Sequence, residues 1–196
     1  MCDVNTPTET PTDLAPVLEF LNSWRIPNDT RVVTDELPDL LEQRERWTDR
    51  FPSLPSPPTD LRGQDELTSL RDVLRDSLGQ DRPTSLQAAI DRHRWSVEIT
   101  AEGSPKVRIV ADGEPAAADL LRRVIDAVRD GYWGRVRACP DCRWVFYDSS
   151  RNGRRRWCSM TAEAGARGCG SIAKTRSYRA RHAAKDVGAA QESSSR

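Results

Sequence analysis

Residues 139–158 read CPDCRWVFYDSSRNGRRRWC, and a further cysteine follows at Cys169. The Cys-x2-Cys spacing of Cys139 and Cys142 is typical of a knuckle, a tight turn from which two thiolates reach the same ion at about 2.3 Å. Cys158 and Cys169 would complete a tetrahedron of sulfur ligands around zinc. We therefore predict one structural Zn²⁺ ion, held by these four cysteines.

Other roles for these thiols are compatible with the sequence. Cys139 and Cys142 could form a redox pair, although no βαβ pattern surrounds them. All four thiols could also be buried without a ligand, and His182 is an alternative fourth ligand. Because the chain has no signal peptide and no apolar run long enough to span a membrane, we expect a cytoplasmic, nucleoid-associated protein without membrane contact. Clustered cysteines in that compartment bind metal more often than they pair.

The charge of the chain is divided unevenly between its two parts. The 196 residues contain 30 Lys and Arg against 30 Asp and Glu, so the net charge is zero. Residues 1–134 hold 16 basic and 25 acidic side chains, whereas residues 135–182 hold 12 and 3. A basic block attracts polyanions locally, whatever charge the rest of the chain carries. The acidic part could also fold back on the basic part as an autoinhibitory contact.

The basic side chains of the C-terminal part are mostly arginines, with aromatic residues such as Trp157 and Tyr178 among them. Such a run is commonly only a solvated, solubilising face. The planar fork of arginine also makes paired, charge-assisted hydrogen bonds with phosphate, which suits DNA. The candidate DNA-binding residues are Arg151, Arg154, Arg155, Arg156, Lys174, Arg176, Arg179 and Arg181. If each neutralised one phosphate, binding would weaken with salt along a log–log slope of about −7.

The part before the cysteines has the pattern of a mainly helical domain, residues 13–134. Apolar residues recur at helical spacing in four longer segments and one short one. These segments are 13–24, 35–47, 59–78, 115–130 and the short 84–93. The buried face of the last long helix is predicted to contain Leu120, Leu121, Val124 and Val128.

Two further features complete the predicted domain organisation. Trp95, Val97 and Ile99 alternate with polar residues, and Val107 and Ile109 do so again after a turn, which predicts a β-hairpin. The ends of the chain, residues 1–12 and 185–196, are expected to be disordered.

The cysteine-rich part, residues 135–184, has the pattern of a small finger. A hairpin is predicted between the second and third cysteines, with residues 144–147 as one strand and residues 154–157 leading back to Cys158. A helix is expected over residues 171–184. Knuckle, hairpin, third ligand and terminal helix resemble a treble clef. The predicted fold class is therefore α+β, mainly α: a helical N-terminal domain with one β-hairpin, followed by a small treble-clef-like zinc finger.

Residues 139–160 resemble the CGNR zinc finger, most closely in 148–152 and 155–160, and the basic tail 173–181 fits that family. The CGNR finger follows an ABATE domain in bacterial stress-induced transcription regulators, and residues 18–23, LEFLNS, are similar to the start of that domain. The chain departs from the family at its fourth cysteine. Cys169 is followed by Gly-Ser-Ile in place of Gly-Asn-Arg, after an insertion that its glycines would allow to loop out.

The resemblance implies a zinc-dependent, DNA-binding transcriptional regulator. Its N-terminal domain would sense a small-molecule effector or contact a protein partner, and the protein could be a homodimer. Asn22 and Trp24 match the family's opening motif and could line a pocket, although hydrogen bonding of Asn22 within the fold is the preferred alternative.

Two other functions fit the residues. The first is a zinc-stapled protein-interaction module without direct DNA binding, and the second is an RNA-binding protein. We expect no enzymatic activity, because the two histidines, His93 and His182, lie far apart and the sequence has no phosphate-binding glycine loop.

Overall fold

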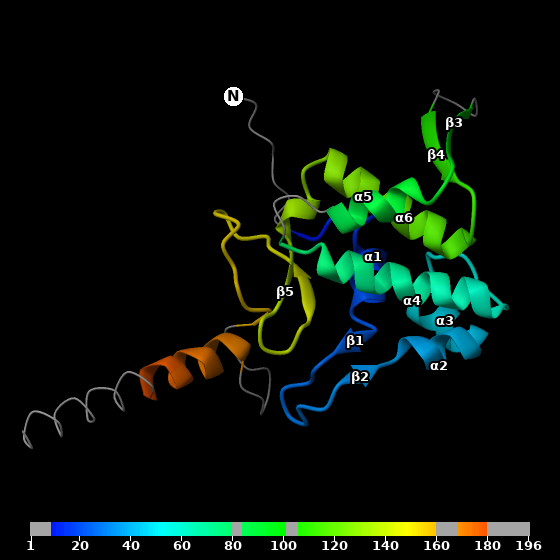
Figure 1. Ribbon diagram of the computed structural model, residues 1–196. Helices are drawn as coiled ribbons and strands as arrows, with labels where there is room; N and C mark the ends of the chain where they lie inside the picture. Colours follow the sequence, from blue (N-terminus) through cyan, green and yellow to red (C-terminus); the bar gives the residue numbers. More distant parts are fainter. Residues whose placement is uncertain (1–8, 80–83, 101–105, 160–167, 180–196) are drawn as a thin grey trace, which may run out of the picture.

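The computed structural model describes residues 9–79, 84–100, 106–159 and 168–179. It has the predicted α+β, mainly α fold (Figure 1). The segments 1–8 and 185–196, for which disorder was predicted, lie outside the described residues. The same is true of the insertion over 161–167 and of the candidate residues Arg181 and His182.

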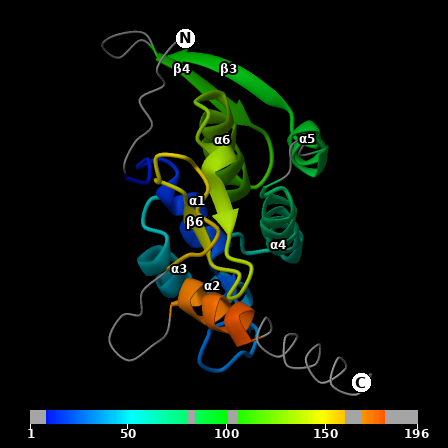
Figure 2. The same cartoon turned by 90° about the vertical axis from the view of Figure 1, so that its left-hand side faces the viewer.

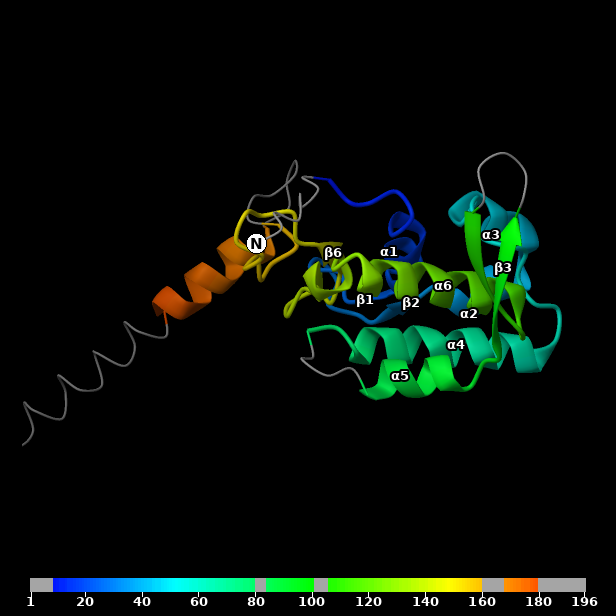
Figure 3. The same cartoon turned by 90° about the horizontal axis from the view of Figure 1, so that it is seen from above.

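Three helices form the centre of the molecule: α1 (Ala15–Leu21), α4 (Leu61–Asp76) and α6 (Pro115–Arg129). The shortest, α1, contacts both others, and its Val17, Phe20 and Leu21 are fully buried. Helix α5 (Thr84–Asp91) lies along α4 (Figure 3). The helices predicted over 13–24, 59–78, 84–93 and 115–130 are thus confirmed, with slightly shorter bounds.

One side chain on α6 was placed wrongly by the periodicity. Leu120, Leu121 and Val124 are buried as predicted, but Val128 is 49% exposed. The buried stripe continues through Ala127, whose carbonyl accepts a hydrogen bond from the backbone N–H of Tyr132. The chain therefore turns back over Ala127 and leaves Val128 on the solvent side.

The helix predicted to follow Thr34 is two helices, α2 (Leu37–Glu42) and α3 (Arg44–Arg50). Asp35 instead belongs to β2 (Thr34–Asp35), which pairs antiparallel with β1 (Trp24–Arg25). The prediction failed there because of Asp35. Its carboxylate accepts from the N–H of Leu37 at 3.1 Å and pairs with Arg71 of α4 at 2.5 Å, which fixes the residue outside the helix.

The predicted hairpin of the helical part is present as β3 (Trp95–Thr100) and β4 (Lys106–Ala111). Strand β4 contacts α6. Figures 1 and 3 show this hairpin at the end of the molecule opposite the cysteine-rich part.

The cysteine-rich part begins with the 3-10 helix η1 (Trp133–Arg135), followed by β5 (Val136–Ala138) and β6 (Val145–Tyr147). Strand β6 pairs with β5, so the hairpin encloses the knuckle. The hairpin predicted with residues 154–157 is wrong. Asp148 accounts for this, because its carboxylate accepts from the N–H groups of Ser150 and Arg155 and folds the chain into an unpaired turn.

A final helix occupies residues 169–179, beginning two residues before the predicted start at 171. Figures 1 and 2 show it, in orange, beside the knuckle hairpin and directed away from the helical body. Within the described residues, no helix combines the length and apolarity needed to cross a membrane.

The two parts of the chain share a core. Val136, Val145 and Tyr147 of the knuckle hairpin belong to the same buried cluster as the central helices, and β6 contacts α1. A second, smaller cluster contains Cys139, Cys142, Phe146 and Cys169. A domain boundary at residue 134 therefore stays a prediction, and the shared core shows that the two sides of it pack together.

Candidate metal centre

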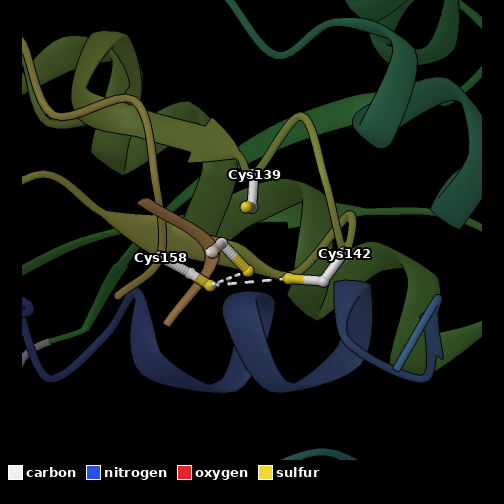
Figure 4. Close-up of side chains that lie close together, drawn as sticks. Cys139, Cys142 and Cys158 are labelled. Carbon is white, nitrogen blue, oxygen red and sulfur yellow. Dashed lines mark hydrogen bonds between the residues drawn. The ribbon is translucent and has the colours of Figure 1, made fainter. Parts of the chain in front are cut away.

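The four predicted ligands meet at one point. The Sγ atoms of Cys139, Cys142, Cys158 and Cys169 all lie within 4.8 Å of one another. The separations are 3.4 Å between Cys142 and Cys158 and 3.5 Å between Cys158 and Cys169. Figure 4 shows the labelled sulfur atoms of Cys139, Cys142 and Cys158 pointing toward one another. Sulfur ligands at about 2.3 Å from a tetrahedral ion lie about 3.8 Å apart, so the cluster fits one Zn²⁺ ion.

The surroundings of the thiols suit a structural ion. Cys139 and Cys169 are 0% and 1% exposed, and the rings of Phe146, Trp144 and Trp157 pack around the cluster. Four thiolates complete the coordination of zinc and leave no position for a reactive water. The arrangement is that of a closed site that stabilises structure.

The pKa values of the thiols show why a cation belongs there. Hydrogen bonds from Cys142 and then Cys158 lower the pKa of Cys139. The same hydrogen bonds raise the pKa values of Cys142 and Cys158, and burial raises them further. Beside the Cys139 thiolate, Cys142 and Cys158 therefore resist ionisation. A divalent cation among the sulfur atoms offsets that repulsion and allows all four to ionise.

Cys169 reaches the cluster despite the insertion before it. It is the first residue of the helix over 169–179. The N–H of Gly170 donates to the carbonyl of Ser159 at 2.9 Å, and the Ser171 hydroxyl donates to the carbonyl of Gly168. The first bond joins the start of the helix to the segment that carries Cys158, and the second closes the first turn of the helix.

A loop from the helical part covers the metal centre. Residues 26–33, which connect β1 and β2, bring the side-chain amide of Asn28 to the Sγ of Cys169 at 2.8 Å. The N–H of Ile26 donates to the carbonyl of Cys142, and Arg31 donates to the carbonyl of Asp141. We name residues 26–33 the β1–β2 loop. Sequence analysis missed its role, because nothing local marks a contact between residues 141 positions apart.

Buried polar bonds hold this loop and the knuckle in place. Arg71 of α4 is 2% exposed and pairs with Asp35 at the end of the loop. The amide of Asn22 donates to the carbonyl of Val145 at 2.9 Å and accepts from its N–H at 2.7 Å. Asn22 is 2% exposed, so its amide serves the junction between α1 and β6. Trp24 packs beneath the guanidinium of Arg75, 4.6 Å from the ring centroid.

The candidate DNA-binding residues fall into two groups. Arg151, Arg154, Arg155 and Arg156 lie on the turn before Cys158, and Lys174, Arg176 and Arg179 lie on the helix that follows Cys169. All seven are exposed. Three of them already have partners within the finger. Arg155 donates to the carbonyls of Trp157 and Cys158, Arg176 pairs with Asp141, and the guanidinium of Arg156 lies 5.8 Å from the centroid of the Trp157 ring.

The finger has very few acidic groups to balance this charge. Its described residues, 135–159 and 168–179, contain ten Lys and Arg but only two acids, Asp141 and Asp148. The side chain of Asp148 is 0% exposed and that of Asp141 is 8% exposed. Burial opposes ionisation of Asp148, but hydrogen bonds from Ser150 and Arg155 and the charge of Arg137 lower its pKa overall. The described surface of the finger is therefore almost purely cationic.

Residues 135–182 match the family model of the CGNR zinc finger. This part of the chain is a CGNR zinc finger. The match includes all four clustered cysteines and the helix that begins at Cys169. The departure from the family at residues 170–172 thus leaves the cysteine cluster intact. A comparison with curated proteins gives no match to the chain.

Proposed function

We propose that this protein is a zinc-dependent, DNA-binding transcriptional regulator whose CGNR finger contacts the phosphate backbone. The observation that carries the proposal is the charge distribution of the finger, in which the arginines are exposed and both described carboxylates are buried. A surface that carries only positive charge attracts a polyanion, because no exposed carboxylates compete with it for the arginines.

The metal centre supports the proposal by fixing the two basic groups relative to each other. The turn 151–156 leads into Cys158, and the basic helix starts at Cys169. The Sγ atoms of these two cysteines lie 3.5 Å apart. Zinc binding would therefore hold a turn and a helix together as one surface. Contacts to phosphate from both segments would set the register of the finger on a duplex.

The helical part is proposed as the regulatory module, in keeping with the resemblance of its first helix to an ABATE domain. It contains a cavity of about 680 Å³, lined among others by Arg62, Glu66, His93 and Gly113. That volume lies within the usual range of small-molecule sites. The cavity is a better candidate for an effector than Asn22, whose amide is buried and bonded to the backbone of Val145.

The test is fluorescence anisotropy of the full-length, zinc-loaded protein with a random-sequence DNA duplex at two salt concentrations. Two double variants probe the two basic groups: Arg154→Ala with Arg156→Ala, and Lys174→Ala with Arg179→Ala. Each should weaken binding about tenfold or more at low salt and reduce the log–log salt slope by about 2. The matched control is Arg44→Ala with Arg46→Ala, which removes the same charge from α3.

Three outcomes would contradict the proposal. They are no binding by the zinc-loaded protein, equal losses in the control, and tighter binding of single-stranded RNA than of duplex DNA with the same dependence on the arginines. The last result would establish the RNA-binding alternative. Failure to bind either nucleic acid would favour a protein-interaction module.

A further inference from the structure

A cleft of about 540 Å³ lies between the end of α4 and the finger. The helical part contributes Arg75, Leu78 and Gly79. The knuckle hairpin contributes Arg137, Ala138, Pro140 and Arg143, and the turn contributes Gly153, Arg154, Arg155 and Arg156. Six of these eleven residues are arginines. The cleft thus gathers guanidinium groups from both parts of the chain.

No carboxylate lines this cleft among the described residues. Asp72 and Asp76 line an adjoining hollow with Trp24, and that hollow shares Arg75, Ala138 and Arg143 with the cleft. Burial, followed by the charge of Arg71, lowers the pKa of Arg75 to about 10; Arg143 adds to this effect, and Asp72 and Asp76 partly offset it. Among the described residues, the charged side chains that line the cleft itself are all arginines.

The arginines of the cleft differ in whether their guanidinium groups are hydrogen-bonded to the backbone. Arg75 donates to the carbonyls of Leu21 and Arg143, Arg137 donates to the carbonyl of Gly153, and Arg155 is held by Trp157 and Cys158. These three form the walls. Arg143, Arg154 and Arg156 are exposed, and within the described residues they form no ion pair.

The backbone at Arg143 is also unusual. Its φ of 61° is in the left-handed region, which costs a residue other than glycine about 1 kcal/mol or more. The N–H of Arg143 donates to the carbonyl of Cys139, and its own carbonyl accepts from Arg75. A glycine here would remove the strain, so an arginine in this conformation favours a role for its side chain.

We propose that this cleft binds a compact polyphosphate, such as an inorganic oligophosphate or the triphosphate group of a nucleotide. One phosphate group can occupy only one or two arginine forks, whereas a chain of phosphates can occupy all three of the exposed arginines that form no ion pair, of which Arg156 also lies over the Trp157 ring. The volume of the cleft is that of an ordinary small-molecule site. Arg154 and Arg156 also belong to the proposed DNA surface, so the ligand would compete with DNA, and this consequence alone rests on the proposed function.

The experiment is isothermal titration calorimetry of the full-length, zinc-loaded protein with inorganic tripolyphosphate, orthophosphate and ATP. Zinc content is measured after each titration, because polyphosphates also bind metal ions. Tripolyphosphate should bind at least tenfold more tightly than orthophosphate. Comparable binding of ATP would identify a nucleotide as a possible source of the phosphates, and binding of tripolyphosphate alone would identify an inorganic chain.

The decisive variant is Arg143→Ala, which removes the side chain but retains both backbone hydrogen bonds. It should weaken tripolyphosphate binding about tenfold or more. The double variant Arg154→Ala with Arg156→Ala should weaken it further, while Lys174→Ala with Arg179→Ala should leave it unchanged. Arg129→Ala on α6 is the control.

Tripolyphosphate binding that survives both cleft variants, or that equals orthophosphate binding, would overturn the inference. The two proposals fail separately. If the protein binds DNA but not tripolyphosphate, the proposed function stands and the inference about the cleft fails. If it binds tripolyphosphate through Arg143 but does not bind DNA, the inference about the cleft stands and the proposed function fails.

Discussion

The helical part and the finger are stabilised by different means. Large side chains such as Phe20, Trp47 and Phe51 are almost completely buried among the helices. The finger's own cluster contains three buried cysteines and a single buried ring, Phe146. A segment so short and so poor in apolar side chains needs a metal or disulfides to fold. The metal centre therefore stabilises the finger, whereas the burial of apolar side chains stabilises the helical part.

The largest expected effect comes from removing one zinc ligand. Cys158→Ser should abolish stoichiometric zinc binding and, with it, DNA binding, because structural zinc sites contribute about 10–16 kcal/mol to the folding of such segments. Far-UV circular dichroism should retain most of its helical signal, since α1, α4 and α6 do not depend on the ion. Zinc content by mass spectrometry and anisotropy with DNA measure the two losses.

Cys2→Ser is the matched control for that variant, because Cys2 lies outside the set of four predicted zinc ligands. It should leave both zinc content and DNA binding unchanged. A Cys158→Ser protein that retains one zinc ion per chain would show that the four-cysteine assignment is wrong.

The junction between the two parts should be the next most sensitive place. Asn22→Ala leaves the buried N–H and carbonyl of Val145 without partners, and each unsatisfied group costs about 1–3 kcal/mol. We expect the free energy of unfolding to fall by about 3 kcal/mol, measured by urea denaturation at constant zinc. Asn152→Ala, on the exposed turn, is the control. Equal stabilities of the two variants would show that the hydrogen bonds of Asn22 do not stabilise the junction.

A smaller and more selective effect is expected from the β1–β2 loop. Asn28→Ala removes the hydrogen bond to the Cys169 sulfur. Loss of a hydrogen bond to a metal ligand typically weakens metal binding about 10–100-fold. Competition with a chromogenic chelator measures the zinc affinity. The urea transition of the helical part should change little.

Asp29→Ala serves as the comparison for the loop, because its carboxylate accepts only from the N–H of Thr30 in the described structure. The zinc affinity of Asp29→Ala should match that of the unmodified protein. If both loop variants retained full affinity, the contact between the loop and the metal centre would have no energetic role.

Sequence analysis predicted the features that depend on residues close together in the chain, and it missed those that depend on contacts between distant residues. The long helices were predictable because their apolar spacing is local, and the ligands were predictable because cysteine spacing encodes the knuckle. The pairing of β6 with β5 was missed because the turn after β6 is decided by one buried carboxylate, Asp148. The contacts of Asn28 and Arg75 with the finger join distant parts of the chain, and no periodic pattern records them.

The arginine run shows a further limit of sequence analysis. Its composition predicted a uniform set of DNA contacts, but Arg155 is used to hold the backbone near Cys158. Arg143 was not in the predicted set, and it lines the cleft together with Arg154 and Arg156. Charge can be counted from a sequence, whereas the partner of each charge depends on the fold.

Hydrogen exchange with and without a zinc chelator tests the central claim most directly. The account predicts that chelation accelerates amide exchange in residues 148–159 and 168–179, while the amides of α4 and α6 retain their protection. Peptide-level mass spectrometry resolves these segments in a single experiment. Equal loss of protection in the helices, or unchanged protection in the finger, would contradict the claim that the metal organises the finger and apolar packing organises the rest.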